Sequence, residues 1–264
     1  MNAIPAFKPT TAKIIELSEV MKAMDKKKEV KLNKDGTVNK SHCNKVAGVS
    51  SEVYPFSSEA EIKSMIDVFD NKINNAPDDD KQWIAHRNKM LFLIGINLSL
   101  RISDLVTLKW NFFLKDDMTF RDFYKIQPKK TKKAGKFVTL YFNEVVKRTI
   151  TDYIEQYPIE NMDGFVFKSR EGSGAITEKS VWKIIVDTAA KAGIEHNVGT
   201  HSLRKTFGYH VWHNAEDKEK ALVMLMVIFN HSSVAITKKY IGIMSEEIED
   251  VFNGLNLGLD FLNK

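Results

Sequence analysis

Apolar residues recur at helical spacing along most of the chain after residue 55. Ser58 and Glu61 form a capping-box pattern, and Ile62, Met65 and Phe69 behind it repeat at intervals of three or four residues. This pattern predicts a helix that starts after Ser58. Further helices are expected at Lys81–Leu98, after a cap at Ser103, at Asn143–Tyr157, Thr177–Lys191, His201–His213 and Lys218–Phe229, and from Ser245 onward.

Two short stretches have the composition of β-strands. They are Phe123–Pro128 and Lys136–Phe142, and they flank a basic turn that contains Gly135. Two strands joined by a tight turn pair in the antiparallel sense. We therefore expect a mostly α-helical protein with one small antiparallel β-sheet, an α+β fold.

The first 55 residues differ from the rest. A short helix is expected at Thr11–Met24, followed by three consecutive lysines and an Asp35-Gly36 pair that indicates a turn. The stretch up to Ser51 is polar and contains few large apolar residues. We interpret residues 1–55 as a basic N-terminal arm and residues 56–264 as the main domain.

Composition narrows the class of protein. The chain has 264 residues, 43% of them hydrophobic, which is enough for a sizeable core, and its single cysteine, Cys43, excludes an internal disulfide or a cysteine-rich zinc site. No apolar run approaches the length of a transmembrane helix, and the first residues lack the pattern of a signal peptide. We expect a cytoplasmic protein without membrane contacts.

The net charge of +5 is distributed unevenly. Residues 121–136 contain seven basic residues and one acid, Asp122, while the main body is slightly acidic. Such a segment is typical of a surface that binds a polyanion, but a solvated lysine-rich loop has the same composition. Charge alone leaves both interpretations open.

Five residues outside the lysine segment suit phosphate chemistry. His201 and Arg204 share one face of an expected helix, and Tyr240 follows His231 by nine residues. Arginine binds phosphate oxygens bidentately, and a phenol can act as a nucleophile. Each residue alone has an ordinary structural explanation, such as a packed tyrosine or a helix-end salt bridge at Arg101. Their joint occurrence is what points to a reaction at a phosphodiester.

In this order the motifs resemble those of the tyrosine recombinase (phage integrase) family, and the resemblance covers roughly Phe56–Lys264. The matching segments are Leu100-Arg101-Ile102-Ser103-Asp104-Leu105, Lys129-Lys130-Thr131, His201-Ser202-Leu203-Arg204, Asn230-His231-Ser232-Ser233 and Tyr240. Two positions depart from the family pattern. Asn230 stands where glycine is usual, and asparagine tolerates positive φ; Lys205 stands where histidine is common.

The resemblance implies a site-specific DNA recombinase whose Tyr240 attacks the scissile phosphate and forms a 3′-phosphotyrosyl link. It implies that Arg101, Arg204 and His231 stabilise the pentavalent phosphate and that His201 assists deprotonation of the phenol. Lys130 would protonate the leaving 5′-oxygen, with its neighbouring lysines as competing candidates. No cofactor or metal is implied. The lysines expected to bind DNA are Lys125, Lys129, Lys132, Lys133, Lys136 and Lys205.

The same resemblance extends to organisation and assembly. Residues 56–264 would be the catalytic domain, and residues 1–55 an arm or a minimal DNA-binding module. The protein would bind double-stranded DNA as a tetramer on two paired sites. The C-terminal helix 245–262 would make subunit contacts, although packing on its own subunit remains open.

Several functional classes remain open from the sequence. Among recombinases the chain resembles integrases, resolvases and invertases of phages and mobile elements. A non-catalytic DNA-binding regulator and a type IB topoisomerase are the alternatives, since the topoisomerase shares this chemistry. That all six catalytic positions are occupied argues against a non-catalytic regulator.

Overall fold

The computed structural model describes residues 52–129, 135 and 137–255, without the side chains of residues 244–247 and 249. The chain divides into two units, Met1–Ser51 and Glu52–Lys264, and every described residue lies in the second. Several expectations fall outside the described residues: the helix at Thr11–Met24, the end of the C-terminal helix beyond Leu255, and Lys130, Lys132, Lys133 and Lys136.

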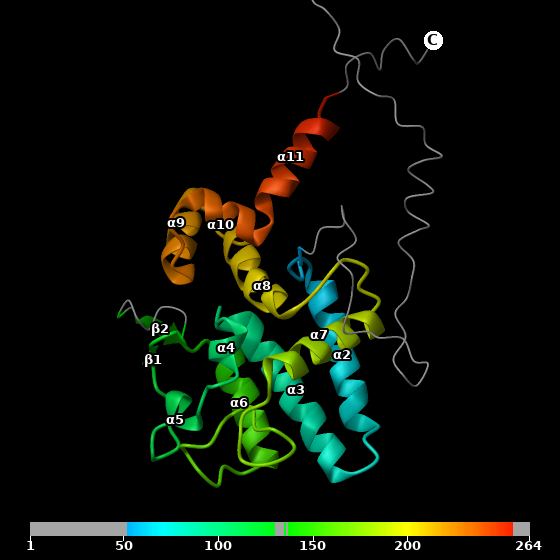
Figure 1. The fold of residues 1–264 in the computed structure, drawn as a ribbon, viewed down its shortest axis with the longest axis vertical. Helices are drawn as coiled ribbons and strands as arrows, with labels where there is room; N and C mark the ends of the chain where they lie inside the picture. Colours follow the sequence, from blue (N-terminus) through cyan, green and yellow to red (C-terminus); the bar gives the residue numbers. More distant parts are fainter. Residues whose placement is uncertain (1–51, 130–134, 136, 256–264) are drawn as a thin grey trace, which may run out of the picture. The chain divides into compact units, whose positions relative to one another are not determined.

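Helices make up most of the described part (Figure 1). In chain order the elements are α2 (Glu59–Asn74), α3 (Asp79–Asn97), α4 (Ile102–Leu105), α5 (Trp110–Phe113), β1 (Phe123–Ile126), β2 (Val138–Tyr141), α6 (Glu144–Gln156), α7 (Glu178–Lys191), α8 (Thr200–His213), α9 (Lys218–Phe229), α10 (Val234–Ile241) and α11 (Ile243–Asn253). The expected α+β fold, mostly helical with one small antiparallel sheet, is confirmed.

Polar side chains start the longer helices where the sequence predicted. The Ser58 hydroxyl accepts a hydrogen bond from the Glu61 backbone N–H at 3.1 Å, and the Glu61 carboxylate accepts one from the Ser58 N–H. This completes the predicted capping box of α2. Asn143 and Thr177 cap α6 and α7 more simply, since each side chain accepts one hydrogen bond from a backbone N–H of the first turn.

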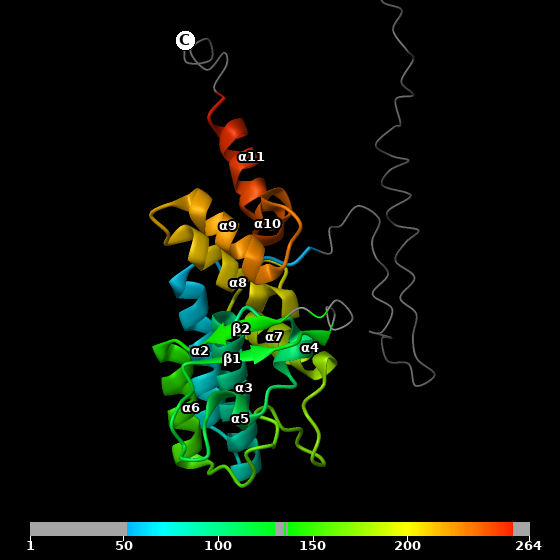
Figure 2. The same cartoon turned by 90° about the vertical axis from the view of Figure 1, so that its left-hand side faces the viewer.

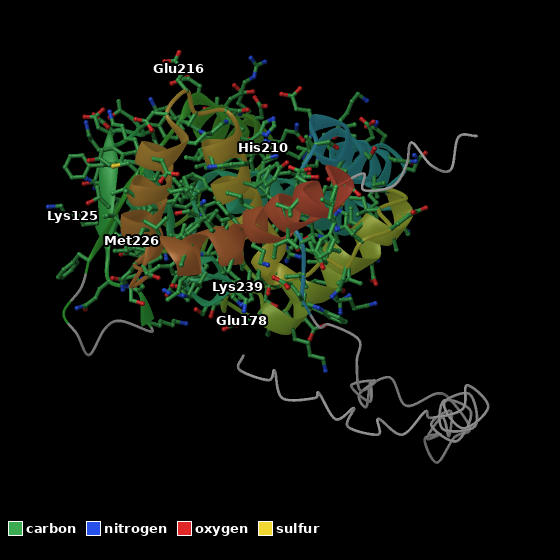
Figure 3. All side chains as sticks on the ribbon, turned by 90° about the horizontal axis from the view of Figure 1, so that it is seen from above. Lys125, Glu178, His210, Glu216, Met226 and Lys239 are labelled. Atoms are coloured by element: carbon green, nitrogen blue, oxygen red, sulfur yellow. The ribbon has the colours of Figure 1, made fainter. Side chains whose placement is uncertain are left out.

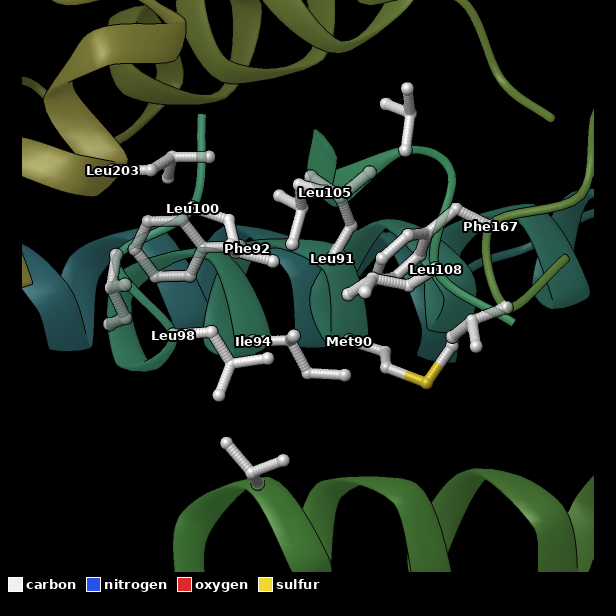
Figure 4. Packing of buried hydrophobic residues seen from close by; sticks show 14 of the residues in the cluster. Met90, Leu91, Phe92, Ile94, Leu98, Leu100, Leu105, Leu108, Phe167 and Leu203 are labelled. Atoms are coloured by element: carbon white, nitrogen blue, oxygen red, sulfur yellow. The ribbon is translucent and has the colours of Figure 1, made fainter. Parts of the chain in front are cut away.

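The helix α3 lies at the centre of the larger hydrophobic core. It packs against α2, α6 and α8, and Figure 4 shows its buried side chains meeting Leu105 and Leu203 of neighbouring segments. A helix that is covered from several sides must be apolar around most of its circumference. The prediction that the helix ending near Leu98 is strongly apolar and buried is therefore confirmed; its buried apolar residues include Met90, Leu91, Phe92, Ile94 and Ile96.

A second, smaller hydrophobic cluster joins α9, α10 and the start of α11. Its buried members are Leu222, Leu225, Phe229, Ile241 and Ile243. The helix α8 contacts both clusters, since Leu203 belongs to the larger one and Phe207 packs against the smaller one. The helix α8 is thus the link between the two parts of the core.

Gly208 allows α8 and α10 to approach closely. A Cβ atom at this position would lie 2.6 Å from Cγ2 of Ile241 and 2.8 Å from Cζ of Phe229, both shorter than real carbon contacts. Only glycine therefore fits this crossing without displacing its neighbours. The close approach sets the position of α10 over α8.

The two strands form an antiparallel pair in which Phe123 faces Tyr141 and Ile126 faces Val138. Tyr124 stacks on Phe112 of α5, with ring centroids 4.4 Å apart. The sheet is anchored to the helical body on one side in this way. Its other side exposes Tyr141, Phe123 and Lys125.

The start of α4 differs from the prediction. Ser103 does not cap this helix but lies inside it, and Arg101 occupies the N-cap position without a side-chain hydrogen bond. The helix is four residues long and ends at Leu105, so Leu108 lies beyond it. Hydrophobic spacing does not reveal so short a helix, because four residues give barely one turn.

The C-terminal helices also begin elsewhere than expected. The pattern did not predict α10 as a separate helix, and α11 begins at Ile243 instead of Ser245. Asn230 and Gly242, with φ of 54° and 92°, end α9 and α10 in the left-handed conformation. These two residues divide one apolar stretch of sequence into consecutive short helices.

The last described helix continues from α10, as Figures 1 and 2 both show in red. Its apolar residues Ile248, Val251 and Phe252 are more than half exposed, as is Leu255 just beyond its end. Among the described residues, no single helix has both the length and the hydropathy to cross a bilayer; only α9 and α10 counted together, across an 89° bend, reach that hydropathy.

Candidate active site

Three segments bring the predicted site residues together. The segment before α4 carries Arg101, α8 carries His201 and Arg204, and the α9–α10 turn with α10 carries His231 and Tyr240. Interactions among these side chains link them into one cluster, as described below. Five of the six predicted catalytic residues therefore meet, and the sixth, Lys130, lies outside the described residues.

Arg204 is the most deeply buried charge of the cluster, with 6% of its surface exposed. Its guanidinium donates to the carbonyl oxygens of Ser99 at 2.5 Å and Phe229 at 3.1 Å, and it stacks over the Phe229 ring at 4.6 Å. In the described part of the chain no carboxylate lies within ion-pair distance of it. The positive charge of Arg204 is therefore held in place by neutral groups, namely two backbone carbonyls and an aromatic ring.

Burial lowers the pKa of Arg204 to about 10. The nearby Arg101 charge acts in the same direction, whereas Tyr240 and Asp104 act against it. The guanidinium remains protonated at neutral pH. A buried cation that lacks a full counterion favours a bound anion.

The hydroxyl of Tyr240 lies 3.3 Å from Nδ1 of His201. Burial raises the pKa of this phenol above its ordinary value, and the charges of Arg204 and Arg101, together with a hydrogen bond from Arg204, oppose that rise. The phenol is therefore neutral at neutral pH and needs a base to become a nucleophile. His201 is placed to receive its proton.

His231 lies two residues after the end of α9, and its backbone N–H donates a hydrogen bond to the Met226 carbonyl. Its ring centroid lies 5.1 Å from that of Tyr240, and its Nδ1 lies 3.1 Å from the Thr237 hydroxyl. Burial lowers the pKa of His231, and the charges of Arg204 and Arg101 lower it further. A bound anion would reverse part of this effect, because it would offset both arginines.

The turn before His231 depends on Asn230, where the family commonly has glycine. Asn230 has φ of 54° and ψ of 48°, the left-handed conformation that asparagine tolerates better than most residues. The expectation that the turn survives this substitution is confirmed by the backbone. Ser99, whose carbonyl binds Arg204, also has a positive φ of 55°.

A cavity of about 270 Å³ opens beside Arg101 and Arg204. Asp104 lies on the same wall, while Phe137 and Val227 contribute apolar surface. The cavity combines two cations with an apolar side, which suits a sugar–phosphate unit. It adjoins the residues that surround Tyr240.

The described end of the lysine segment is fixed at this cavity. Oδ1 of Asp104 accepts a hydrogen bond from the Lys129 N–H at 2.9 Å, and Pro128 lines the cavity. Asp104 is 5% exposed, so this contact is a buried anchor for the chain that enters the lysine segment. Lys130 is the next residue along the chain.

The lysines expected to contact DNA are placed differently from one another. Lys125 and Lys129 are exposed, and Figure 3 shows Lys125 at the outer edge of the molecule, on the β-hairpin. Lys205 is not exposed: it is 5% accessible, and its Nζ lies 3.1 Å from the Glu52 carboxylate and 5.6 Å from the Tyr240 ring centroid. Its surroundings are those of a buried ion pair.

Sequence reasoning missed three groups that shape the site. Thr237 contacts His231, Glu52 pairs with Lys205, and the Ser99 carbonyl binds Arg204. Thr237 could have been suspected, since it lies one helical turn before Tyr240. The other two contacts join residues over 100 positions apart and leave no local signal.

The two histidines at the end of α8 have structural partners. Nε2 of His210 lies 2.9 Å from the Phe56 carbonyl, and the His213 ring stacks on Tyr209 at 5.6 Å. The described residues contain no cluster of three or more potential metal ligands.

Comparison with known proteins identifies the family. Residues 58–247 match the sequence pattern of the phage integrase family. The chain is 36% identical over 181 residues to the probable integrase/recombinase YoeC of Bacillus subtilis, which covers 66% of this chain and 91% of that protein. It is 24% identical over 201 residues to the tyrosine recombinase XerA of Pyrococcus furiosus, covering 76% of this chain and 61% of that protein.

Solved structures show the same fold. A crystal structure of XerA recombinase has a TM-score of 0.52 at 20% identity and covers 73% of this chain and 60% of its own. The XerH site-specific recombinase in a post-cleavage complex with palindromic difH substrate also has a TM-score of 0.52, at 18% identity, over 77% of this chain and 53% of its own. This chain thus spans only part of the length of these recombinases. With a pattern match over most of its length, it belongs to the phage integrase family, the family of the tyrosine recombinases.

Proposed function

We propose that this protein is a site-specific DNA recombinase that cuts and rejoins DNA strands through a phosphotyrosyl intermediate at Tyr240. One observation carries the proposal: the Tyr240 hydroxyl lies within reach of His201 and beside the buried Arg204. A neutral phenol, a proton acceptor and a fixed cation are what attack on a phosphodiester requires. The recombinases among its relatives support the same function.

In the proposed cleavage step, Tyr240, His201 and Lys130 account for the bond formed, the bond broken and both proton transfers. The phenol oxygen of Tyr240 forms a bond to phosphorus, and its proton passes to His201. The bond from phosphorus to the 5′-oxygen breaks, and Lys130 gives that oxygen a proton. The products are a 3′-phosphotyrosyl link and a free 5′-hydroxyl. The reverse step rejoins a strand without another energy source, because the covalent link retains the bond energy.

Arg101, Arg204 and His231 would stabilise the charge on the non-bridging oxygens. Arg204 is held before substrate arrives, so it needs no reorganisation during the reaction. His231 would gain a proton as the phosphate offsets the two arginines, and it could then donate to an oxygen. Lys129, Lys132 and Lys133 remain competing candidates for the acid role of Lys130.

Double-stranded DNA would lie across the face on which the cavity opens, next to Pro128 and Lys129. Lys125 and Lys129 are exposed, and Lys132, Lys133 and Lys136 would add positive charge for phosphate contacts. Phosphate contacts of this kind weaken steeply as salt concentration rises. We keep Lys205 apart from this group, since its ammonium is buried.

We further propose the organisation that the sequence suggested. Residues 1–55 would act as a basic arm or minimal DNA-binding module beside the catalytic domain 56–264, and four subunits would assemble on two paired sites inside the cell. Exposed apolar residues on α11 support a role of the C-terminal helix in subunit contacts. The reaction would be integration, resolution or inversion, typical of phages and other mobile elements.

Covalent trapping tests the proposal. The protein is incubated with fragmented genomic DNA and denatured, and protein-linked fragments are sequenced. We expect fragments enriched in one inverted-repeat site, and we expect Tyr240→Phe to abolish them while DNA binding persists. Tyr157→Phe serves as the matched control, since Tyr157 lies at the end of α6, among the residues of a different cavity.

The other outcomes identify the alternatives. Adducts without sequence preference, together with relaxation of any supercoiled plasmid, would indicate a type IB topoisomerase. DNA binding without adducts would indicate a non-catalytic regulator. Adducts that persist in Tyr240→Phe would reject Tyr240 as the nucleophile.

A further inference from the structure

The segment that precedes α2 is hydrogen-bonded to Asn197, just before α8, and to α8 itself, the helix that carries His201 and Arg204. The Glu52 carbonyl accepts a hydrogen bond from the Asn197 amide at 2.7 Å, and the Tyr54 N–H donates to the Asn197 carbonyl at 2.9 Å. Farther along, the Phe56 N–H donates to the buried Thr206 hydroxyl at 2.9 Å. The backbone of residues 52–56 is therefore held beside the active-site helix.

Glu52 uses this position to reach Lys205. Its Oε1 lies 3.1 Å from Nζ of Lys205, whose side chain is 7% exposed. Removing an ammonium from water is costly unless a partner compensates, so this pair is more than a surface contact. Lys205 directly follows Arg204 on α8 and occupies the position where the family commonly has histidine.

The ammonium of Lys205 also faces the ring of Tyr240. Nζ lies 5.6 Å from the ring centroid, within the range of a cation–π contact. Such a contact fixes the orientation of the ring, and a cation at this distance stabilises a developing phenolate. Glu52 has the opposite charge and weakens that stabilisation.

Several other charged or titratable groups surround the phenol. Arg204 and His201 approach it from α8, Arg101 acts from the segment before α4, and His231 lies on the α9–α10 turn. Arg204 and His201 lie close to the phenolic oxygen, and the His231 ring packs edge-on against the Tyr240 ring. Lys205 places an ammonium group over that ring, so its effect can be separated from theirs by substitution.

We propose that Lys205 is a positioning residue for Tyr240, orienting its ring and favouring the phenolate, and that Glu52 moderates this effect through their ion pair. The proposal rests on the proposed function of Tyr240 as the nucleophile. It gives opposite roles to two residues of one ion pair. It also connects the chemistry to the first residue of the second structural unit, Glu52–Lys264.

The first test measures the phenol in the free protein and does not depend on catalysis. With tyrosine labelled at Cζ with ¹³C and the Tyr240 signal assigned by Tyr240→Phe, the pKa of Tyr240 is read from an NMR titration. We expect Lys205→Met to raise this pKa by about one unit and Glu52→Gln to lower it by a smaller amount. Lys205→Arg should leave it close to the original value.

Lys63→Met is the matched control, because it removes one lysine charge from α2, where the side chain is 75% exposed. Methionine has nearly the length of lysine, so Lys205→Met leaves no large cavity. Glu52→Gln retains a polar partner for Lys205. Circular dichroism and thermal melting of each variant confirm that the fold is intact before titration.

The second test is single-turnover cleavage as a function of pH. For Lys205→Met we expect about tenfold slower cleavage at neutral pH, with recovery as pH rises, since a higher phenol pKa is overcome by alkali. Glu52→Gln should cleave at least as fast as the unaltered protein. A lysine that only stabilised the fold would slow cleavage equally at every pH.

The outcomes separate this proposal from the proposed function. If Lys205→Met and Glu52→Gln shift the pKa of Tyr240 in the same direction, or not at all, the role of Lys205 is rejected while Tyr240 can remain the nucleophile. If Tyr240→Phe still forms adducts, Tyr240 is not the nucleophile, and the premise of this proposal fails. The measured pKa shifts would then describe a structural contact only.

Discussion

At the residue scale, neutral backbone and aromatic groups hold the charged side chains of the site in position. Arg204 is held by the Ser99 and Phe229 carbonyls and by the Phe229 ring. Two positive φ values, at Ser99 and Asn230, turn the backbone where these contacts form. Such conformations persist only when surrounding packing maintains them, and here they supply a cation that is already in place.

Thr237 gives a testable case at this scale. Its hydroxyl lies 3.2 Å from the Ser233 carbonyl and 3.1 Å from Nδ1 of His231. The hydroxyl donates its one proton to the Ser233 carbonyl, so toward His231 it acts as an acceptor. The ring of His231 must therefore carry a proton on Nδ1. We expect Thr237→Val to slow cleavage about tenfold, the size of one lost buried hydrogen bond.

Single-turnover cleavage and ¹⁵N chemical shifts of the His231 ring check this prediction. Thr237→Ser keeps the hydroxyl and is the matched control, so it should retain the rate and the tautomer. Equal rates in the valine and serine variants would show that the hydroxyl does not position His231.

Most residues of the candidate site could be predicted because they lie in short local motifs. His201 with Arg204, and His231 with Tyr240, are each separated by less than ten positions. Glu52 and Ser99 could not be predicted, since their partners lie over 100 residues away and their own types carry no signal. Lys205 is the instructive case: its charge predicted DNA contact, whereas its burial depends on tertiary packing that composition does not encode.

At the element scale, short helices were the least predictable feature. The long helices α2, α6 and α7 follow their apolar spacing and capping residues closely. The helix α3 was predicted too, but it begins at Asp79, two residues before its expected start. The short helices α4 and α10 are set by turns and by tertiary contacts rather than by periodicity. Both adjoin the site, whereas α8, which carries His201 and Arg204, was predicted from the sequence.

The crossing of α8 and α10 yields a prediction at this scale. Gly208→Ala would place a methyl group 2.6 Å from Ile241 Cγ2, so the two helices must separate. We expect a loss of about 1–3 kcal/mol in the free energy of unfolding, together with slower cleavage as Tyr240 moves.

Urea unfolding measures this loss. Gly174→Ala is the control, because no atom lies within 4 Å of a Cβ added at Gly174. A Gly208→Ala variant as stable as the control would mean that the crossing is not tightly packed.

At the scale of the whole molecule, one described subunit leaves apolar surface uncovered. Val251 and Phe252 on α11 are 71% and 72% exposed. An amphipathic helix gains stability only when its apolar face is covered, which supports the proposed contact with another subunit.

The exposed face of α11 gives a prediction about assembly. We expect Phe252→Asp to reduce formation of the four-subunit complex on paired sites while covalent attachment to a single site persists, because α11 carries none of the catalytic residues. Sedimentation of protein–DNA complexes measures assembly. Val145→Asp on α6, where Val145 is 47% exposed, is the control. Unchanged assembly in Phe252→Asp would indicate that α11 packs on its own subunit.

The division of the core into two clusters has a consequence for how the protein loses activity. Arg204 lies on α8 next to Leu203, which belongs to the larger cluster. Tyr240 packs against the smaller cluster. The smaller cluster has few buried residues, so it can open locally at a lower free energy than the whole fold. Heat would then inactivate the protein below its melting temperature, reversibly, because opening of the smaller cluster removes Tyr240 and the Phe229 contacts of Arg204 while the larger cluster stays folded.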